Sequence, residues 1–537
     1  MSSPPTPPRR STLRRLPPAW TITALLALIY VIAAPASPDL AAASYRSNLF
    51  SRVGFTLWDN SWYGGHHLPA YSLLAPALGA LIGPQPVAAL SMTAATALFA
   101  ALIAGRFPAR AVWIGAAWFA VGTSVSLLSS RVPFDLGLAV GLGALLAVQR
   151  GRLWPALGLS LVCAVASPVA GAFLALAYVA WGLTNSARRW PAALALAALA
   201  PIGLLTIVFP EGGTQPFVAS AFYPALAGTI VVGALMAPEQ RMLRVGAALY
   251  ALALIGAYVL PTAVGGNVDR LGSLAAGPIA ACVLAGGSLR TRRTLALIVL
   301  APALLYWQAN APVADFSASV SNPEVQASFY APLVGELGKL GIGYAATPAR
   351  IEVVATTDHW EARWLAPHVM LARGWERQLD RDRNALFYDE SQPIAAQSYR
   401  EWLVREAISY VALPDATLDY SAASEAQLLR NPPPYLHEVW RSAKWRLWAV
   451  RDPQPLAQAP AMLTQVSTDS FTLEAPRAGS YTVRIHFTPY WALAAGGGCV
   501  AEAPEEWTKI EARSAGDFRV DIDFSLDRIF SDSARCS

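Results

Sequence analysis

The chain has 537 residues, of which 55% are hydrophobic and only 14% charged, and its formal net charge is +5. This length is too great for one ordinary domain, and the composition excludes an ordinary soluble chain in favour of a multi-spanning membrane protein. The positive charge does not indicate nucleic-acid binding, because the arginines lie in short loops between apolar runs, where membrane topology accounts for them.

Charge is distributed unevenly along the chain. Residues 1–312 contain no lysine and only six acidic residues, whereas charges are dense and apolar runs short after about residue 313. We therefore predict a transmembrane domain over 19–312 and a soluble half over 313–537.

The N-terminal segment 1–18 is rich in proline and arginine, and we predict that it is disordered and cytoplasmic. The apolar run Trp20–Ser37 follows. Ala34, Pro35 and Ala36 resemble a signal-peptide cleavage site, so a cleaved signal peptide remains an alternative. An arginine-flanked first span needs no cleavage, and we interpret the run as a span.

Ten further spans are predicted from apolar windows of about 17–20 residues. With the first run they make eleven. The windows lie near 86–104, 111–128, 134–149, 153–167, 169–184, 190–209, 217–236, 242–260, 271–288 and 294–311.

The first outer loop, 38–85, ends in the ambiguous apolar piece Leu68–Ile82. If this piece does not cross the bilayer, fifteen arginines lie in the cytoplasm and only Arg46, Arg52, Arg131 and Arg270 lie outside. That bias is the one expected for bacterial membrane proteins. We therefore predict that Leu68–Ile82 is a helix lying on or dipping into the outer leaflet.

The same topology places five of the six acids of the membrane half outside, together with the soluble half. Those five are Asp39, Asp59, Asp135, Glu211 and Asp269, and only Glu239 faces the cytoplasm. This distribution predicts polar chemistry at the outer surface, because polar groups beside membrane spans usually mark function.

Candidate catalytic residues come from the outer loops. A carboxylate, Asp39 or Asp59, can take the proton from an attacking hydroxyl. Arg131 and Arg270 can hold a phosphate leaving group, and each lies close in sequence to an acid, Asp135 or Asp269. Each of these residues also has a purely structural interpretation, as a helix cap, an interface anchor or a surface pair.

Aromatic and histidine side chains fill the stretch Phe55–Pro84. The aromatic rings can stack on a sugar or anchor the loop at the interface. Adjacent histidines suggest a divalent metal, but two neighbouring histidines rarely bind one ion without a third ligand, so metal dependence stays open. The candidate substrate-binding residues of this stretch are Trp58, Trp62, Tyr63, His66, His67 and Tyr71.

One apolar span leads into a long outer loop with an early acid, Asp39, then the stretch LWDNSWYGGHHLPAYSLL (57–74), then Ile82-Gly83-Pro84. This arrangement resembles the GT-C superfamily of membrane glycosyltransferases, of the bacterial and actinobacterial type. The resemblance implies about eleven spans, a catalytic carboxylate in the first outer loop and a polyprenyl-phosphate sugar donor. The family position favours Asp39 and the local WDN context favours Asp59. Many members carry paired acids, which this loop lacks.

The soluble half contains two patterns. Over 313–455, Arg350–Ala355 and Ile408–Leu413 are predicted strands, and His359–Gly374 and Ser398–Ala407 are predicted helices, so an α/β module is expected. Over 456–537, period-two alternation predicts a β-sandwich.

Two of the four cysteines belong to the predicted outer domain. Cys499 and Cys536 can form a disulfide outside the cytoplasm, and two unpaired thiols are the alternative.

The function that these features predict is transfer of a sugar from a polyprenyl-phosphate donor to a cell-envelope glycan or glycolipid, outside the plasma membrane of a bacterium. The alternatives are a secondary transporter and a non-catalytic envelope assembly protein with an outer partner-binding domain. No nucleic-acid partner is expected. Beyond the metal question no cofactor is predicted.

Overall fold

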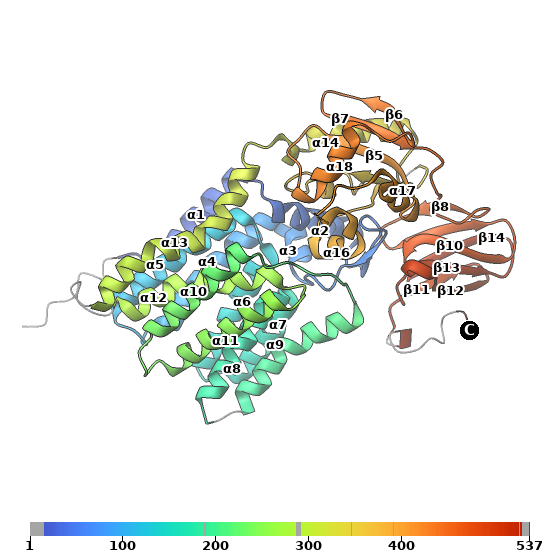
Figure 1. Cartoon of the computed structure of the whole chain (residues 1–537). Coiled ribbons are helices and arrows are strands. Elements are labelled where there is room, and N and C mark those ends of the chain that lie inside the picture. Colours follow the sequence, from blue (N-terminus) through green and yellow to red (C-terminus); the bar gives the residue numbers. More distant parts are fainter. Residues whose placement is uncertain are drawn as a thin grey trace, which may run out of the picture.

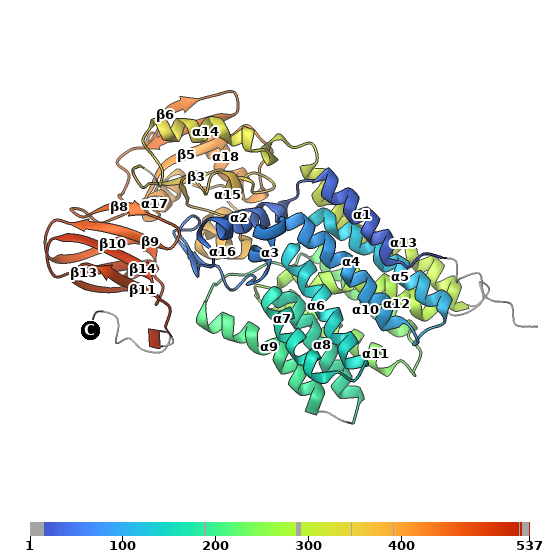
Figure 2. The same ribbon diagram turned by 180° about the vertical axis from the view of Figure 1, so that it is seen from behind.

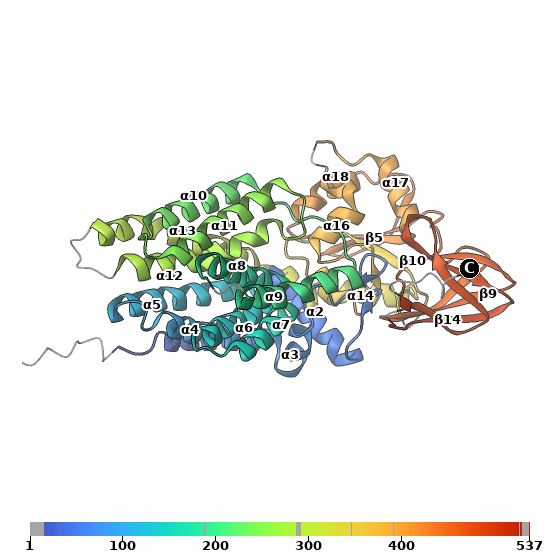
Figure 3. The same cartoon turned by 90° about the horizontal axis from the view of Figure 1, so that it is seen from below.

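The structure is a computed structural model that describes residues 16–186, 189–285, 292–344, 346–389, 391–525, 527–528 and 536. A helical part, an α/β module and a β-sandwich follow one another along the molecule (Figure 1; Figure 2 from behind). Figure 3 shows the sandwich at the end farthest from helices α5 and α12. Most of the predicted N-terminal segment 1–18 lies outside the described residues.

The helical part forms at the apolar runs of the sequence. Its helices are α1 (Trp20–Ala33), α2 (Pro38–Val53), α3 (Ala75–Ile82), α4 (Pro84–Ile103), α5 (Ala109–Ser126), α6 (Val132–Gln149), α7 (Leu153–Ala166), α8 (Pro168–Thr184), α9 (Arg189–Val208), α10 (Ala219–Leu235), α11 (Arg241–Val259), α12 (Asp269–Leu284) and α13 (Arg292–Ser319).

Among the described residues, six helices are long and apolar enough to cross a membrane, or up to seven if the bent pair α1 and α2 counts as one. The helices α7, α8 and α10 are apolar but shorter, with 14 to 17 residues. The protein is therefore a multi-pass membrane protein, and the number of eleven spans stays a prediction.

The segment from α1 to α3 departs from a simple span pattern. Helices α1 and α2 are bent by 74° across the break at residues 34–37, where Ala34 has a left-handed backbone and Pro38 begins α2. Helix α3 has eight residues and is about 12 Å long, too short to cross a hydrocarbon core of about 30 Å. Only the second half of the predicted helix Leu68–Ile82 is therefore helical, as α3.

The α/β module has a five-stranded sheet with strand order β4-β3-β5-β7-β6. Strand β3 pairs in parallel with β4 and β5, and β7 pairs antiparallel with β5 and β6. The elements are α14 (Ala327–Lys339), β3 (Arg350–Val353), α15 (Glu361–Trp364), β4 (Met370–Leu371), α16 (Arg377–Arg383), α17 (Ala396–Arg405), β5 (Ile408–Pro414), α18 (Ala423–Arg430), β6 (Leu436–Arg441) and β7 (Trp445–Val450).

Two apolar cores cover the two faces of this sheet. Side chains of α14 and of α2 pack on one face, around Ile351 and Val353. Side chains of α17 and α18 pack on the other face, around Val411. Helix α2 is therefore shared between the membrane part and the α/β module.

The strands and one helix of the module lie where the sequence predicts them, at β3, β5 and α17. The predicted helix His359–Gly374 is wrong, because only Glu361–Trp364 is helical and β4 follows. Pro367 removes a backbone donor in the middle of that run. Helix α13 also continues to Ser319, past the predicted boundary at residue 312.

The β-sandwich pairs a four-stranded sheet, β11-β14-β9-β8, with a three-stranded sheet, β10-β13-β12. Its core contains alternate residues of the strands, such as Val483, Ile485 and Val520, as the period-two pattern predicts. The strands are β8 (Met462–Val466), β9 (Ser470–Ala475), β10 (Gly479–His486), β11 (Trp491–Ala495), β12 (Gly498–Glu502), β13 (Trp507–Ala512) and β14 (Gly516–Ile522).

Candidate functional site

The stretch 57–74 begins with a small hairpin made of β1 (Trp58–Asp59) and β2 (His66–His67). Trp58 pairs with His67 and Asp59 with His66. The turn needs glycine at Gly65, where φ is +114° and an added Cβ would lie 2.4 Å from the Trp58 ring. Gly65 therefore serves the close packing of the hairpin on its own tryptophan, whereas Gly64 lies against the side chains of Arg350 and His486.

The tryptophans of this stretch are buried in two different soluble cores. Trp58 belongs to the core of the sandwich and meets the Trp491 ring edge-on, with centroids 5.7 Å apart. Trp62 is 0% exposed, belongs to the core beneath the α/β sheet and donates a hydrogen bond to the Ala362 carbonyl at 3.2 Å. These rings join the two soluble parts to the membrane part, and neither has an open face for a sugar.

Tyr63 and the two histidines take part in the same junction. Tyr63 donates a hydrogen bond to the Glu376 carbonyl at 3.0 Å. His67 Nδ1 lies 2.9 Å from Glu211 of the loop between α9 and α10, and His67 Nε2 lies 3.0 Å from the Thr488 hydroxyl. Burial lowers the pKa of His66 to about 4. These contacts hold the loop against three separate segments.

Asp59 is enclosed in this junction. Its side chain is buried, accepts a hydrogen bond from the Tyr45 hydroxyl at 2.8 Å and accepts another from the Ser61 backbone amide at 2.9 Å. A carboxylate in these surroundings fixes the hairpin and α2. It has no path to an incoming hydroxyl without opening the junction.

Asp39 lies in different surroundings, in the first turn of α2. Arg131, at the start of α6, places its Nε 3.3 Å from Asp39 Oδ2, and its Nη2 lies 3.6 Å from Asp315 of α13. The side chains of Asp39 and Arg131 are 22% and 21% exposed. Three helices thus bring two carboxylates to one arginine, and each of these side chains keeps part of its surface exposed.

Arg270, at the start of α12, is the second arginine of this cluster. Its guanidinium carbon lies 5.5 Å from the centroid of the Phe134 ring. Asp39, Arg131 and Asp135 are all near enough for their charges to act on it. Arg270 therefore joins Asp39 and Arg131, although the three are far apart in the sequence.

Tyr71, Asp135 and Asp269 border the same cluster. Burial raises the pKa of Tyr71, and the nearby Asp39 carboxylate raises it further. Asp135, in the first turn of α6, is 0% exposed. Asp269 accepts a hydrogen bond from Trp307 Nε1 at 2.8 Å, which turns it toward α13 and makes it a structural partner.

A line of polar side chains leads from this cluster into the α/β module. Asp315 accepts a hydrogen bond from the Ser129 hydroxyl at 2.6 Å. One turn further along α13, the Ser319 hydroxyl donates to Asp358 at 2.5 Å. The next residue, His359, has a φ of +54°, uncommon for a side chain of this size. The C-terminal end of α13 and the edge of the α/β module thus share one polar boundary.

His359 ends this line between two carboxylates. Its Nδ1 lies 3.1 Å from Glu361 and its Nε2 3.6 Å from Asp419. Burial acts to lower the pKa of His359, but the Asp419 and Glu361 carboxylates outweigh it and raise the pKa to about 9. The imidazole is therefore charged at neutral pH.

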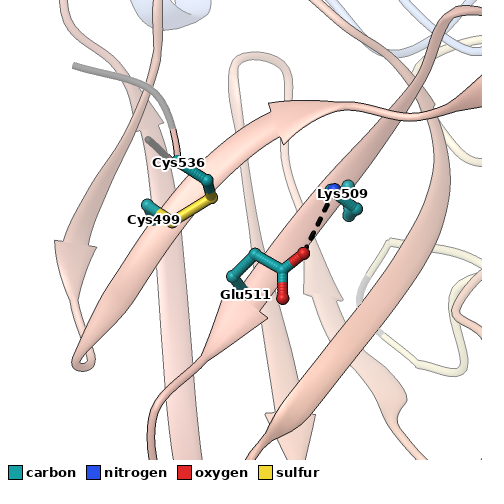
Figure 4. The surroundings of a disulfide bond; sticks show 4 residues. All are labelled: Cys499, Lys509, Glu511 and Cys536. Carbon is teal, nitrogen blue, oxygen red and sulfur yellow. Dashed lines mark ion pairs between the residues drawn. A yellow bond between two sulfur atoms is a disulfide. The ribbon is translucent and has the colours of Figure 1, made fainter. Parts of the chain in front are cut away.

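The disulfide pairs Cys499 of β12 with Cys536 near the end of the chain (Figure 4). It lies on the sandwich beside the ion pair between Lys509 and Glu511, which spans 3.1 Å. The remaining cysteines, Cys163 and Cys282, are buried in the helical part.

Within the described part of the chain, no three His, Cys, Asp or Glu side chains converge in a way that could hold a metal ion. In the Asp39 cluster the two carboxylates, Asp39 and Asp315, already face Arg131. Both carboxylates therefore pair with the Arg131 guanidinium in this structure.

The structure adds two residues that the sequence pattern does not select. The dense charges from about residue 313 predict that Asp315 belongs to the soluble half, and only the length of α13 places it beside Arg131. Arg46 is predicted only as an outside charge, although its position seven residues after Asp39 puts both on one face of a helix.

No family model matches the sequence, and no curated protein matches it. Similar solved structures include the mycobacterial arabinofuranosyltransferase AftD, at 17% identity and a TM-score of 0.43, covering 82% of this chain and 42% of that one. They also include the Archaeoglobus fulgidus oligosaccharyltransferase in the apo form, at 12% identity and a TM-score of 0.46, covering 74% and 69%. The chain thus spans less than half the length of the arabinofuranosyltransferase.

Proposed function

We propose that the protein is a membrane glycosyltransferase that moves a sugar from a polyprenyl-phosphate donor to a cell-envelope glycan or glycolipid, on the extracytoplasmic face of a bacterial plasma membrane. The observation that carries the proposal is the cluster of Asp39 with Arg131 and Arg270 at the outer ends of α2, α6 and α12. The resemblance of the first outer loop to the GT-C superfamily supports a polyprenyl-phosphate sugar as the donor.

The chemistry divides among these three side chains. Asp39 accepts the proton of the acceptor hydroxyl as its oxygen attacks the anomeric carbon. The bond from that carbon to the phosphate oxygen breaks, and the lipid phosphate leaves with the electron pair. Arg131 and Arg270 offset the negative charge that grows on the phosphate. In the free protein Arg131 Nε lies 3.3 Å from Asp39 Oδ2.

The test is transfer of radiolabelled sugar by the full chain in nanodiscs, with polyprenyl-phosphate arabinose and polyprenyl-phosphate mannose as donors. Asp39→Asn should lower the transfer rate by about 100-fold to 10,000-fold, the usual range for a lost general base. Asp59→Asn is the matched control, and it should keep the rate per folded molecule.

Two results would contradict this proposal. Full transfer by Asp39→Asn would remove Asp39 as the base. Absence of transfer by the unchanged protein from either donor, to membrane extracts that contain envelope glycans, would contradict the donor class.

A further inference from the structure

A groove lies between the second half of α2 and the segment that leads into α3. It encloses about 30 Å³ and is otherwise open to the outside. Its polar lining is limited to Arg46, Thr56 and Ser72. The remaining lining residues are apolar or glycine: Leu49, Phe50, Gly54, Phe55, Leu68, Pro69, Leu73 and Pro76. The groove is thus a mostly apolar channel with one cation.

Arg46 is 5% exposed and only partly satisfied. Its Nη2 pairs with Glu376 of the α/β module, and its guanidinium carbon lies 4.1 Å from the Tyr71 ring centroid. Its Nε and Nη1 have no hydrogen-bond partner among the described residues. Because unsatisfied buried donors are costly, an anionic oxygen in the groove would relieve a penalty that the free protein carries.

The rim of the groove is exposed and apolar. Phe55 is 61% exposed and Val53 is 47% exposed, both directly after or at the end of α2. On the neighbouring helix α3, Leu81 is 78% exposed and Ile82 is 51% exposed. Such a surface beside the outer ends of membrane helices suits the boundary between lipid tails and headgroups.

We propose that this groove binds one anionic phospholipid of the outer leaflet. Its phosphate accepts hydrogen bonds from Arg46, and one acyl chain lies along Phe55, Leu68 and Leu73. The charge of Arg46 selects an anionic headgroup over a zwitterionic one, and the apolar walls select a lipid over a free anion.

This lipid site is separate from the proposed transfer site. Arg46 follows Asp39 by seven residues, so the two lie about 10 Å apart along α2. The anionic and phenolic groups that act on Arg46 are Tyr71, Asp59, Tyr63 and Tyr45, together with the paired Glu376. The inference therefore does not depend on the proposed glycosyl transfer.

A bound lipid would link the membrane part to the α/β module. Arg46 would contact the lipid phosphate on one side and Glu376 on the other. Because a ligand that binds only the folded state stabilises it, anionic lipid should raise the temperature at which this junction opens.

The experiment uses the full chain in nanodiscs of phosphatidylcholine with and without phosphatidylglycerol. Native mass spectrometry measures retained lipid, and thermal unfolding measures stability. We expect one phosphatidylglycerol retained per chain and a higher Tm in its presence. Arg46→Gln should weaken retention about tenfold or more, because a charge-assisted contact to the phosphate is lost. Leu68→Trp, which fills the groove and leaves Arg46 and Glu376 in place, should abolish retention even where Arg46→Gln fails to fold.

Leu252→Ala is the matched control, since it removes an exposed apolar side chain of α11, which does not line the groove, and it should retain the lipid as the unchanged protein does. Equal retention of phosphatidylcholine and phosphatidylglycerol would overturn the proposal. So would unchanged retention in Leu68→Trp. Retention of polyprenyl phosphate alone, with no phosphatidylglycerol, would also overturn it by assigning the groove to the donor lipid.

Discussion

Two aspartates of the segment 38–85, twenty residues apart, have opposite surroundings. Asp39 begins α2, is 22% exposed and faces Arg131. Asp59 is 0% exposed and is held by Tyr45 and Ser61 inside a junction of three parts. Under the proposed function, the density of unusual side chains and the reaction site do not coincide. The stretch richest in Trp, His and Tyr holds the molecule together, and the proposed chemistry belongs to the sparser start of α2.

The proposed role of the Asp39 cluster is tested most directly at Arg131. Arg131→Gln should lower sugar transfer by about 100-fold to 1,000-fold, because a donor aimed at a developing negative charge is lost. Steady-state transfer at saturating donor measures this effect. Arg106→Gln, an exposed arginine in the loop between α4 and α5, is the control and should transfer normally. A normal rate in Arg131→Gln would mean that the phosphate lies elsewhere.

The opposite behaviour is expected of Trp62. Trp62→Ala should destabilise the junction by about 3–5 kcal/mol, since a fully buried ring is removed, while molecules that stay folded keep their transfer rate. Denaturant unfolding and activity per folded molecule separate the two effects. Trp154→Ala, at a position 74% exposed, should leave stability nearly unchanged. Loss of transfer in folded Trp62→Ala would make the ring part of the reaction site.

Much of this arrangement could be predicted from the sequence, because it depends on local pattern. Apolar runs place the helices, and period-two alternation places β10 and β14 of the sandwich. The predicted helix over residues 359–374 failed because apolar and aromatic content alone does not separate a buried helix from a short parallel strand.

The roles of the two aspartates could not be predicted in this way. Trp62 is buried by Ala362 and Gly374, about 300 residues away, and no local pattern encodes that contact. A stretch rich in Trp, Tyr and His can stack on a sugar or pack in the core of a junction, and its composition does not distinguish the two. Asp39 and Arg131 are both candidates from the sequence, but their proximity depends on how α2 and α6 pack.

The disulfide gives a smaller effect, confined to the sandwich. Cys499→Ser should lower the stability of the sandwich by about 2–4 kcal/mol, because Cys499 and Cys536 close a loop with a sequence separation of 37. Thermal unfolding with and without a reducing agent measures it. Cys163→Ser, in the helical part, controls for loss of a thiol. If reduction of the disulfide abolished sugar transfer at once, the sandwich would be part of the reaction site.

The smallest effect is a dependence of stability on pH at His66. The folded pKa of about 4 lies below the unfolded value of about 6.5, so the unfolded state binds the proton first as the pH falls. Stability should therefore decline between about pH 6.5 and pH 4, by up to about 3 kcal/mol. His66→Gln should flatten this decline in urea unfolding at successive pH values, and an unchanged slope would show that His66 is not buried as a neutral ring.

The most direct measurement of the central claim is a cryo-EM structure of the full chain in a nanodisc with a non-transferable polyprenyl-phosphate sugar analogue. We predict that the phosphate lies against Arg131 and Arg270, with the anomeric carbon near Asp39. A phosphate bound against the β1–β2 hairpin beside Asp59, with the cluster at the start of α2 unchanged, would contradict the account.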